Sequence, residues 1–355
     1  MGQATQTAFR KAEKKYAQRS QTPDLHNVVD LAAASTRAAG QAVRGIQLTH
    51  DLESPATLPF QLFSHKRPPA FVLRDHPGLV LIPNPFTDEA QRWLARKCLC
   101  DCPRPPNRTN LTPFFNEPPE SMFSLAANAP ARSKRIGCRS HEDTLQLGVT
   151  LPKDSFYTQD ELPSDLLERL RWCTLGQQYN WTTKEYDLGS SPFDTDADAL
   201  MRAIALAITH PDEASDMPAS NGYDGAAFVS EAGIVNYYDE RATMAGHVDK
   251  TEEKMDAPLI SFSIGLSCIY LIGSATRDTE PTALMLRSGD VLAMCGESRM
   301  AYHGVPRVFA GTSPEFLSCP AAGDQDKAAE MYPEWHYFAR YLSRHRINCN
   351  ARKCS

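Results

Sequence analysis

Short hydrophobic runs separated by polar turns dominate the chain from residue 226 onward. The turn formers include Gly273-Ser274 and Ser288-Gly289-Asp290. The runs are three to eleven residues long and rich in β-branched and aromatic side chains, which is typical of strands. They predict strands over residues 228–238, 259–266, 269–272, 284–286, 291–294, 301–308 and 346–352. This pattern predicts an all-β core, as in a jelly-roll or cupin-like double sheet.

The chain before residue 226 predicts elements that support this core. An apolar strand over 78–85 ends in prolines, and a helix follows from Thr87 to Leu99 with Thr87 as its N-cap. A short helix is expected over 162–172 and a clearer one over 194–208. The second of these carries an apolar face of Leu200, Ala203, Ile204, Ala207 and Ile208. We therefore expect an α+β fold in which helices pack behind a double-stranded β-helix.

Three regions follow from these patterns. Residues 1–75 form an N-terminal extension, with a basic, solvent-facing helix over 5–19 and an extended arm over 20–70. Residues 76–225 hold the supporting helices and a lid region, including a Pro-rich loop over 103–160 that is a lid, an insertion or disorder. Residues 226–355 form the double-stranded β-helix core.

Composition limits the classes of partner. The 355 residues carry a formal net charge of -6, so the chain has no global attraction to phosphate backbone, and any nucleic-acid surface must be local. The sequence contains no apolar stretch long enough for a membrane span and no secretory signal, which predicts an intracellular protein with reduced cysteines. Nucleus, cytoplasm and mitochondrion all remain open. We expect a monomer that does not bind a membrane.

The central chemical pattern is His247-Val248-Asp249 followed by His303. In an extended strand, residues two apart point to the same face, so His247 and Asp249 can reach one metal ion, and a later strand can add His303. Two imidazoles and one carboxylate leave three positions open, the arrangement of non-heme Fe(II) oxygenases. A His-x-Asp tripeptide alone arises often by chance, so the interpretation depends on further features.

The segment from Arg346 to Arg352 is the first of these features. With a period of two, Arg346, Asn348, Asn350 and Arg352 share one face, while small apolar residues share the other. Such a strand either faces water or lines a polar cavity. Guanidinium groups suit the two carboxylates of a dicarboxylic cosubstrate.

A second polar pair lies at the end of an earlier predicted strand. Asn236 and Tyr238 share a face and offer an amide and a phenol to a carboxylate. In isolation, a pair of core tyrosines at 237 and 238 would explain the pattern equally well.

The order and spacing of these motifs resemble the AlkB family of Fe(II)- and 2-oxoglutarate-dependent dioxygenases. The words over 170–176 and 179–181, with Pro83-Asn84-Pro85, are similar to the eukaryotic branch called AlkB homologue one. The motifs that carry the resemblance are Asn236-x-Tyr238, His247-x-Asp249, Ser261 to Leu266, Ser288 to Val291, Gly296 to Arg299, His303 to Pro306 and Arg346-x-Asn348-x-x-x-Arg352.

This resemblance implies cofactors and site residues. His247, Asp249 and His303 would be the Fe(II) ligands and the catalytic centre. For 2-oxoglutarate, the resemblance implies a distal-carboxylate site of Asn236, Tyr238 and Arg346, with Asn348 beside it, and Arg352 at the chelating end. The family usually has threonine where this chain has Asn350. Dioxygen would be the second cosubstrate.

The substrate implied by the resemblance is an N-methylated base in tRNA or DNA. A base flipped out of its stack would meet aromatic and polar side chains of the lid. Candidates for contact with the base are Trp172, Gln177, Tyr179, Trp181 and Arg277. Candidates for contact with phosphates are Arg132, Lys134, Arg135, Arg139, Arg340, Arg344 and Lys353.

Two alternatives to this function stay open at the level of sequence. The same core could hydroxylate a protein or a small metabolite, which an apolar, closed lid would favour. The chain could also be an inactive nucleic-acid-binding module that keeps the fold. The complete metal pattern and the two arginines argue against that alternative, because an inactive protein has little physical reason to retain all five residues.

Overall fold

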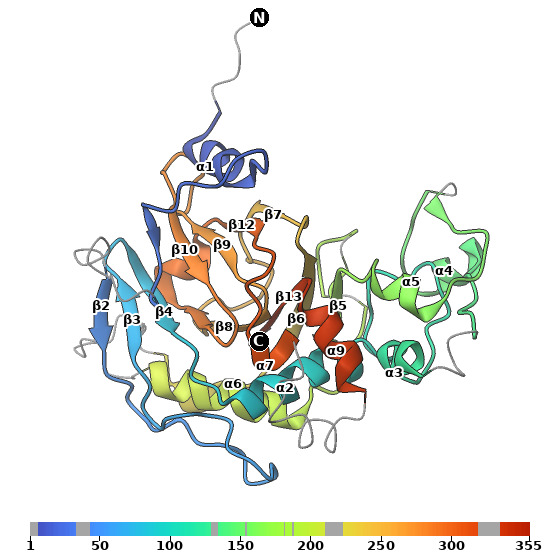
Figure 1. The fold of residues 1–355 in the computed structure, drawn as a ribbon, viewed down its shortest axis with the longest axis horizontal. Coiled ribbons are helices and arrows are strands. Elements are labelled where there is room, and N and C mark those ends of the chain that lie inside the picture. Colours follow the sequence, from blue (N-terminus) through green and yellow to red (C-terminus); the bar gives the residue numbers. More distant parts are fainter. Residues whose placement is uncertain are drawn as a thin grey trace, which may run out of the picture.

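The β-strands lie in two sheets that face each other (Figure 1). The computed structural model describes residues 6–32, 43–128, 134–152, 155–180, 182–186, 188–209, 223–318 and 334–355. Within these residues the larger sheet has the order β2 (Val43–Ile46), β3 (Ala70–Leu73), β4 (His76–Ile82), β11 (Val291–Met294), β8 (Leu259–Gly265), β13 (His345–Arg352), β6 (Ala232–Asp239) and β5 (Trp172–Gly176). The smaller sheet has the order β1 (Val28–Val29), β10 (Thr282–Leu286), β9 (Cys268–Ile272), β12 (His303–Val308) and β7 (Met244–His247).

The seven predicted core strands are confirmed, with shifts at their ends. Strand β11 has the predicted bounds, whereas β6 begins at Ala232 because a 3-10 turn over Gly225–Ala227 precedes it. Likewise, β12 begins at His303 because the residues before it, Gly296–Met300, form a 3-10 helix. Strand β7 was not predicted. The fold is the expected α+β jelly-roll.

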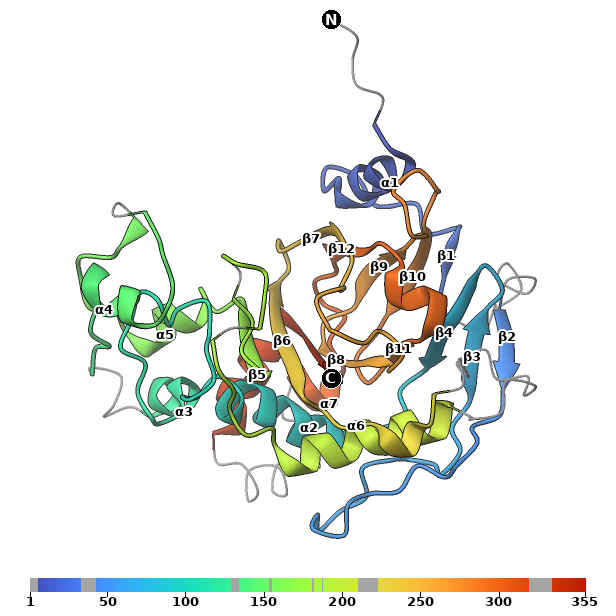
Figure 2. The ribbon, with the colours of Figure 1, turned by 180° about the vertical axis from the view of Figure 1, so that it is seen from behind.

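Alternation along the strands divides the buried residues between two layers. On β8, Phe262 and Ile264 face the helices outside the larger sheet, whereas Leu259 faces the space between the sheets. The outer layer contains α2 (Asp88–Arg96) and α6 (Thr195–Ile208), which run along the outer face of the larger sheet (Figure 2), together with α7 (Glu315–Ser318) and α9 (Trp335–Leu342). The space between the sheets is therefore left to residues of the inner faces alone.

The predicted supporting helices are confirmed in their starts. Thr87 caps α2, its hydroxyl accepting a hydrogen bond from the Ala90 amide at 3.1 Å, and Asp194 caps α6 in the same way. A short π-helix over Lys97–Asp101 continues α2 beyond the predicted end. On α6, Ala203 is only partly buried, because the buried face turns toward Met201 and Ala205 instead.

The N-terminal extension contributes to both sheets. Strands β2 and β3 extend the larger sheet, and β1 pairs in parallel with β10. Helix α1 (Ala8–Ala17) packs on the outer face of the smaller sheet rather than facing water. The prediction of a solvent-facing helix was wrong because its basic residues mask an apolar stripe of Phe9, Ala12 and Tyr16, which are buried.

The lid region stands to one side of the sheets (Figures 1 and 2). Its described part contains α3 (Met122–Ala127), α4 (His141–Gln146) and α5 (Pro163–Leu167). The predicted helix over 162–172 was wrong at its end, since α5 stops at Leu167 and Trp172 begins β5. That segment pairs with β6, and the gain of this cross-strand pairing decides its conformation.

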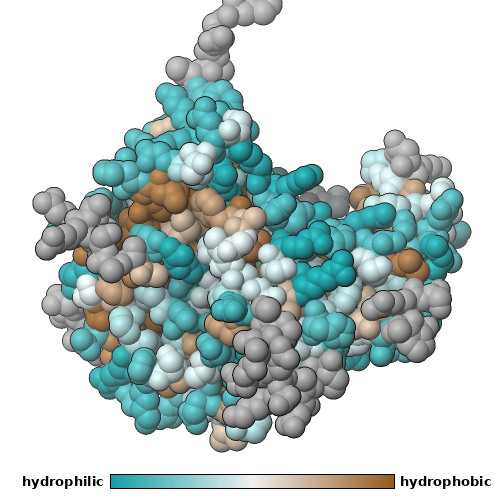
Figure 3. Space-filling model, viewed as in Figure 1, coloured by the Kyte–Doolittle hydropathy of each residue, from teal (hydrophilic) through white to brown (hydrophobic). Residues whose placement is uncertain are grey.

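The surface in Figure 3 is mostly hydrophilic, with hydrophobic side chains gathered over β10 below α1. Among the described residues, none of the helices has the length and apolar character required to span a bilayer. The described cysteines form no disulfide with one another, and the reduced state stays a prediction.

Candidate metal centre and cosubstrate cavity

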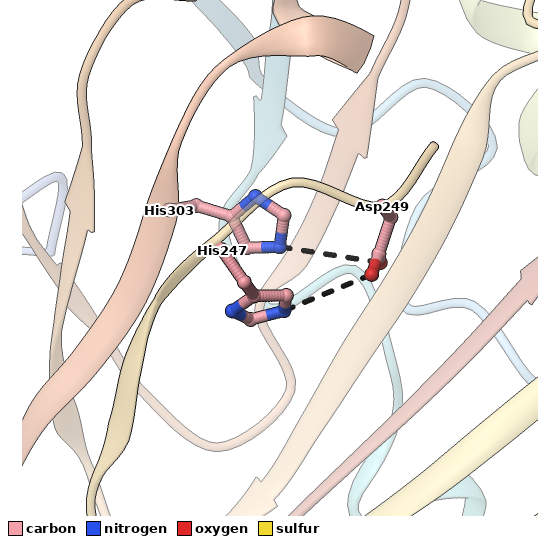
Figure 4. Close-up of side chains that lie close together, drawn as sticks. All are labelled: His247, Asp249 and His303. Carbon is pink, nitrogen blue, oxygen red and sulfur yellow. Dashed lines mark ion pairs between the residues drawn. The ribbon is translucent and has the colours of Figure 1, made fainter. Parts of the chain in front are cut away.

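Three side chains meet at the edge of the smaller sheet (Figure 4). His247 Nε2 lies 3.7 Å from Asp249 Oδ1, and His303 Nε2 lies 4.0 Å from Asp249 Oδ2. The two imidazole ring centres are 4.4 Å apart. One ligand atom from each residue lies within 4.8 Å of the others, so a single ion can contact all three.

Strand pairing places these residues. His247 ends β7 and is the direct cross-strand partner of His303, which begins β12. Asp249 follows in the loop after β7, two residues beyond His247. The two-residue spacing therefore brings the His247 and Asp249 side chains together as predicted, although the strand itself stops at His247.

Backbone carbonyl groups fix the two imidazoles. His247 Nδ1 lies 2.9 Å from the Ala245 carbonyl oxygen, and His303 Nδ1 lies 3.1 Å from that of Ala301. A carbonyl oxygen can only accept a hydrogen bond, so each Nδ1 donates its proton there. Each Nε2 is left to face the space between the three side chains, where a metal ion would bind. Burial, reinforced by the neighbouring His247, lowers the pKa of His303 to about 4, so this ring is neutral at pH 7.

The carboxylate ligand is held in its charged form. Burial alone would raise the pKa of Asp249, but the nearby Arg352 guanidinium outweighs this effect and holds the pKa well below its usual range. Arg352 Nη1 lies 3.4 Å from Asp249 Oδ2. Two imidazoles and one carboxylate are the donor set that non-heme Fe(II) centres use, so the residues present fit the metal.

The Arg352 guanidinium is neutralised by other side chains. Its Nη1 donates to Glu252 Oε1 at 3.0 Å, and its Nη2 donates to Asn350 Oδ1 at 2.8 Å. Glu252 also lies 3.3 Å from Nη2 of Arg299, and both Glu252 and Arg299 are buried. Asn350 thus supplies a hydrogen bond to Arg352 at the position where the family usually has threonine.

The Arg346 guanidinium has a different environment. Arg346 is 1% exposed, and its Nη2 donates to the Ser263 hydroxyl at 2.7 Å. Its Nη1 lies 3.4 Å from the Leu266 carbonyl oxygen, and its Nε has no hydrogen-bond partner among the described residues. Within the described part of the chain, Arg346 forms no ion pair with a carboxylate, since the nearby Asp290 accepts from backbone amides instead.

One cavity of about 350 Å³ joins the three converging side chains to both arginines. Asn236, Tyr238, Asn348 and Asn350 also line it, as the alternation along β6 and β13 predicted. The opposite face of β13 is buried against the helices, also as predicted. Sequence reasoning missed Tyr270, which lines the cavity and stacks on the His303 ring at 5.8 Å.

Comparison with known proteins identifies the family. The family model described as the 2OG-Fe(II) oxygenase superfamily matches residues 78–352. The chain belongs to the 2OG-Fe(II) oxygenase superfamily. Its cofactor is therefore Fe(II), with 2-oxoglutarate and dioxygen as cosubstrates, in agreement with the sequence prediction.

Relatives within this superfamily match almost the whole chain. A tRNA demethylase of Schizosaccharomyces pombe is 32% identical over 97% of this chain and 95% of its own length. A DNA N(6)-methyladenine demethylase of Arabidopsis thaliana is 31% identical, with 99% and 96% covered. The human nucleic acid dioxygenase ALKBH1 is 31% identical, with 98% and 83% covered. This oxygenase therefore belongs to the AlkB homologue one branch that its motifs resemble.

The predicted base-contact residues of this oxygenase occupy different places. Tyr179 lies close enough to Asp249 for that charge to help burial raise the pKa of its phenol, and it packs edge-on against Tyr186 at 5.3 Å. Trp172 pairs with Asn236 across β5 and β6 and lines a second pocket in the lid region. Gln177 bridges to Ser190 at the end of β5, and Trp181 lies outside the described residues.

Arg277 contacts the strand that carries His247. Its Nη2 donates to the Gly246 carbonyl oxygen at 2.6 Å, and its guanidinium lies over the Tyr302 ring. It does not appear among the residues that line the cavity. Tyr179 does not line the cavity either and shares the second pocket with Trp172, whereas Arg277 contacts the backbone of the strand that carries His247.

The predicted phosphate contacts also divide into two groups. Arg135 and Arg139 donate to backbone carbonyl groups of the lid region, and Arg344 lies 3.8 Å from Glu168. Lys134 and Arg340 are exposed, Lys353 is partly exposed, and Arg132 lies outside the described residues.

Proposed function

We propose that this chain is a nucleic-acid dioxygenase that oxidises N-methyl groups on bases of tRNA or DNA. The relatives that match it over nearly their whole lengths are named for activity on methylated nucleic acid. The buried Arg346, a cation without a carboxylate partner among the described residues, supports the cosubstrate site in the same cavity as the metal ligands.

The metal ligands in this proposal are His247, Asp249 and His303. Their Nε2 and carboxylate oxygen atoms converge within 4.8 Å, and the carbonyl groups of Ala245 and Ala301 orient the two rings. Hydrogen bonds to the second ring nitrogen typically fix a ligating imidazole and raise its basicity. The centre is thus prepared before the ion arrives.

The distal carboxylate of 2-oxoglutarate binds Arg346 in this proposal. A buried cation that lacks an anion costs free energy, and a carboxylate ligand removes that cost. Tyr238 and Asn236 line the same cavity and add a phenol and an amide, with Asn348 beside them. Arg352, near the chelating end, acts through Asp249, whose carboxylate it contacts at 3.4 Å.

The base reaches the metal centre from the side of the lid. Tyr179 and Tyr186 offer aromatic faces close to Arg352, and Trp172 lies further into the lid region. A base flipped out of its stack binds between such rings, and stacking contributes about 1–3 kcal/mol per base in single-strand binders. Because the net charge is -6, contact with phosphates falls to local cations such as Lys134 and Arg340.

When bound, Fe(II) and 2-oxoglutarate use dioxygen to place a hydroxyl group on the methyl carbon, yielding succinate and carbon dioxide, and the hydroxymethyl group can leave as formaldehyde. The protein's residues position the methyl carbon and exclude water. The apolar walls of the cavity, including Leu259, Leu286 and Leu292, serve the exclusion of water. The sequence's predictions of a monomer and of an intracellular compartment stay predictions.

The test is succinate formation by anaerobically iron-loaded protein, with and without methylated tRNA or methylated DNA oligonucleotides. We expect nucleic acid to stimulate turnover and the methyl group to be lost from the base by mass spectrometry. His247→Ala should abolish both, while His336→Ala, which changes an exposed histidine on α9, should not. Turnover that no nucleic acid stimulates would contradict the substrate and favour a protein or metabolite.

A further inference from the structure

Helix α1 contacts the strand that carries a metal ligand. Strand β7 is only four residues long and is the edge strand of the smaller sheet among the described strands. One side of β7 pairs with β12, whereas no strand of the described residues lies on its other side. The position of His247 therefore depends on what holds this free edge.

Two side chains take over the hydrogen bonds of Gly246, the residue directly before His247. Glu13 Oε1 accepts a hydrogen bond from the Gly246 amide at 2.6 Å. Arg277 Nη2 donates to the Gly246 carbonyl oxygen at 2.6 Å, and the Arg277 carbonyl oxygen in turn accepts from the Phe9 amide at 3.0 Å. Glu13 and Arg277 thus replace the missing neighbouring strand at one residue.

Packing seats the helix in this position. Phe9 is 1% exposed and packs with Ile269 and Leu271 on the outer face of the sheet. Its ring lies so close to Gly246 that a Cβ atom there would stand 2.4 Å from Phe9 Cε1. A glycine at this position therefore permits the close approach that brings Glu13 to the backbone.

Docking of α1 on the sheet does not by itself explain why a buried glutamate stands at position 13. An apolar side chain would dock the helix at lower cost, because burying a charge is unfavourable unless it is paired and hydrogen-bonded. Arg10 pairs with the second oxygen at 2.8 Å on the solvent side, and the first oxygen serves Gly246. Since Ala245 orients the His247 ring, the backbone that Glu13 fixes is the one that aims Nε2.

We propose that Glu13 is a positioning residue of the metal centre, acting through Gly246 on His247 together with Arg277. This inference rests on the proposed metal ligands. Glu13 lies before the span matched by the family model, residues 78–352, so the metal centre of this chain includes an N-terminal part that the shared core does not supply.

The experiment titrates the full-length, metal-free protein with Co(II) and follows both the affinity and the visible absorption spectrum. Loss of an outer-shell partner typically weakens metal binding 10–100-fold, and for Glu13→Met we expect about tenfold, with a changed spectrum. Glu13→Gln keeps an acceptor oxygen and should restore both. Lys14→Ala, an exposed change on the same helix, should leave both unchanged.

Deuterium uptake over residues 8–17 shows whether the helix stays docked. If Glu13→Met keeps the helix docked and binds Co(II) with unchanged affinity and spectrum, the inference is wrong, and it is equally wrong if Glu13→Gln is as weak as Glu13→Met. If Glu13→Met frees the helix, the Arg277→Met variant is the deciding test. This substitution keeps the Arg277 backbone carbonyl that holds α1. Arg277→Met is then expected to weaken Co(II) binding as Glu13→Met does, and an unchanged Co(II) affinity of Arg277→Met overturns the inference.

Failure of the metal centre itself would look different. In that case the unchanged chain would not bind Co(II), or His247→Ala would bind it as well as the unchanged chain. Either result overturns the proposed ligands, and the inference with them, whereas the Glu13 variants test the positioning alone.

Discussion

The two ends of the cavity each hold a buried arginine, but the two guanidinium groups have different neighbours. At one end, Arg352 contacts Asp249, Glu252 and Asn350. At the other end, Arg346 contacts a hydroxyl and a carbonyl group. Alternation along β13 puts both on one face, yet only one of them has its charge balanced by the described chain. The difference teaches that a buried cation can serve either the fold or a ligand, according to its partners.

The largest effect is expected at Asp249, which lies in the candidate metal centre and also contacts Arg352. Asp249→Asn removes the charge that both the metal ion and Arg352 need. Succinate formation should fall by more than about 100-fold, beyond the range of outer-shell partners. The control is Asp165→Asn in the lid region, which should leave turnover unchanged. Comparable turnover by both variants would contradict the assignment of Asp249.

The next prediction tests whether the ion pairs around Arg352 stabilise the fold. Glu252→Gln removes the carboxylate that forms ion pairs with both Arg299 and Arg352, and leaves these two buried cations with Asp249, which pairs with Arg352. Breaking a buried ion pair costs about 3–5 kcal/mol, so urea unfolding should show a loss of about 3 kcal/mol.

The matched change for Glu252 is Glu253→Gln, an exposed neighbour, which should leave the free energy of unfolding unchanged within experimental error. Equal stabilities of the two variants would remove the contrast between the two ends of the cavity.

A smaller effect is expected at the end of the cavity that holds Arg346, and it should appear in cosubstrate binding instead of stability. Arg346→Met should raise the KM for 2-oxoglutarate by about tenfold or more, since a charge-assisted hydrogen bond contributes about 1.5–3 kcal/mol. The free energy of unfolding should not fall in proportion, because the variant removes a buried cation that has no carboxylate partner in the described chain.

Arg340→Met, on the exposed face of α9, is the control for Arg346. The outcome that contradicts the comparison is a large loss of stability in Arg346→Met together with an unchanged KM.

The smallest effect concerns a carboxyl group that has hydroxyl partners in place of a guanidinium. Burial raises the pKa of Glu117 to about 7, although the hydroxyls of Thr112 and Thr109 act in the opposite direction. The folded state therefore keeps its proton where the unfolded chain has lost it, and stability falls as pH rises from about 4.5 to 7.

Glu117→Gln should remove this part of the pH dependence, measured by urea unfolding at pH 5 and pH 8. The control is Glu120→Gln, an exposed neighbour, which should keep it. An identical pH dependence in all three proteins would show that Glu117 titrates normally.

The sequence predicts those parts of the molecule in which local pattern and tertiary structure agree. The two-residue period from Arg346 to Arg352 identified the cavity face of β13, and Thr87 identified the start of α2. Strand β7 escaped prediction because Met244 to His247 includes alanine and glycine, which do not favour strands, and only pairing with β12 makes it extended.

The charged partners of the site were less predictable. Glu252 and Arg299 are 47 positions apart and meet only in the folded state, so no local pattern announces the pair. The same holds for Glu13 and Gly246, whose contact joins the first helix to the metal strand. A glutamate on the buried side of a helix was the available signal, hidden by the basic residues around it.

The place of β13 within the larger sheet has a consequence for how the molecule is assembled. This strand lies between β6 and β8, yet it follows both along the chain. Until it arrives, β6 and β8 each expose an open edge, and non-local pairing of this kind slows folding. The proposed metal ligands are thus synthesised before the strand that carries both arginines. Closure of the sheet and completion of the cavity are a single event, brought about by the insertion of one strand.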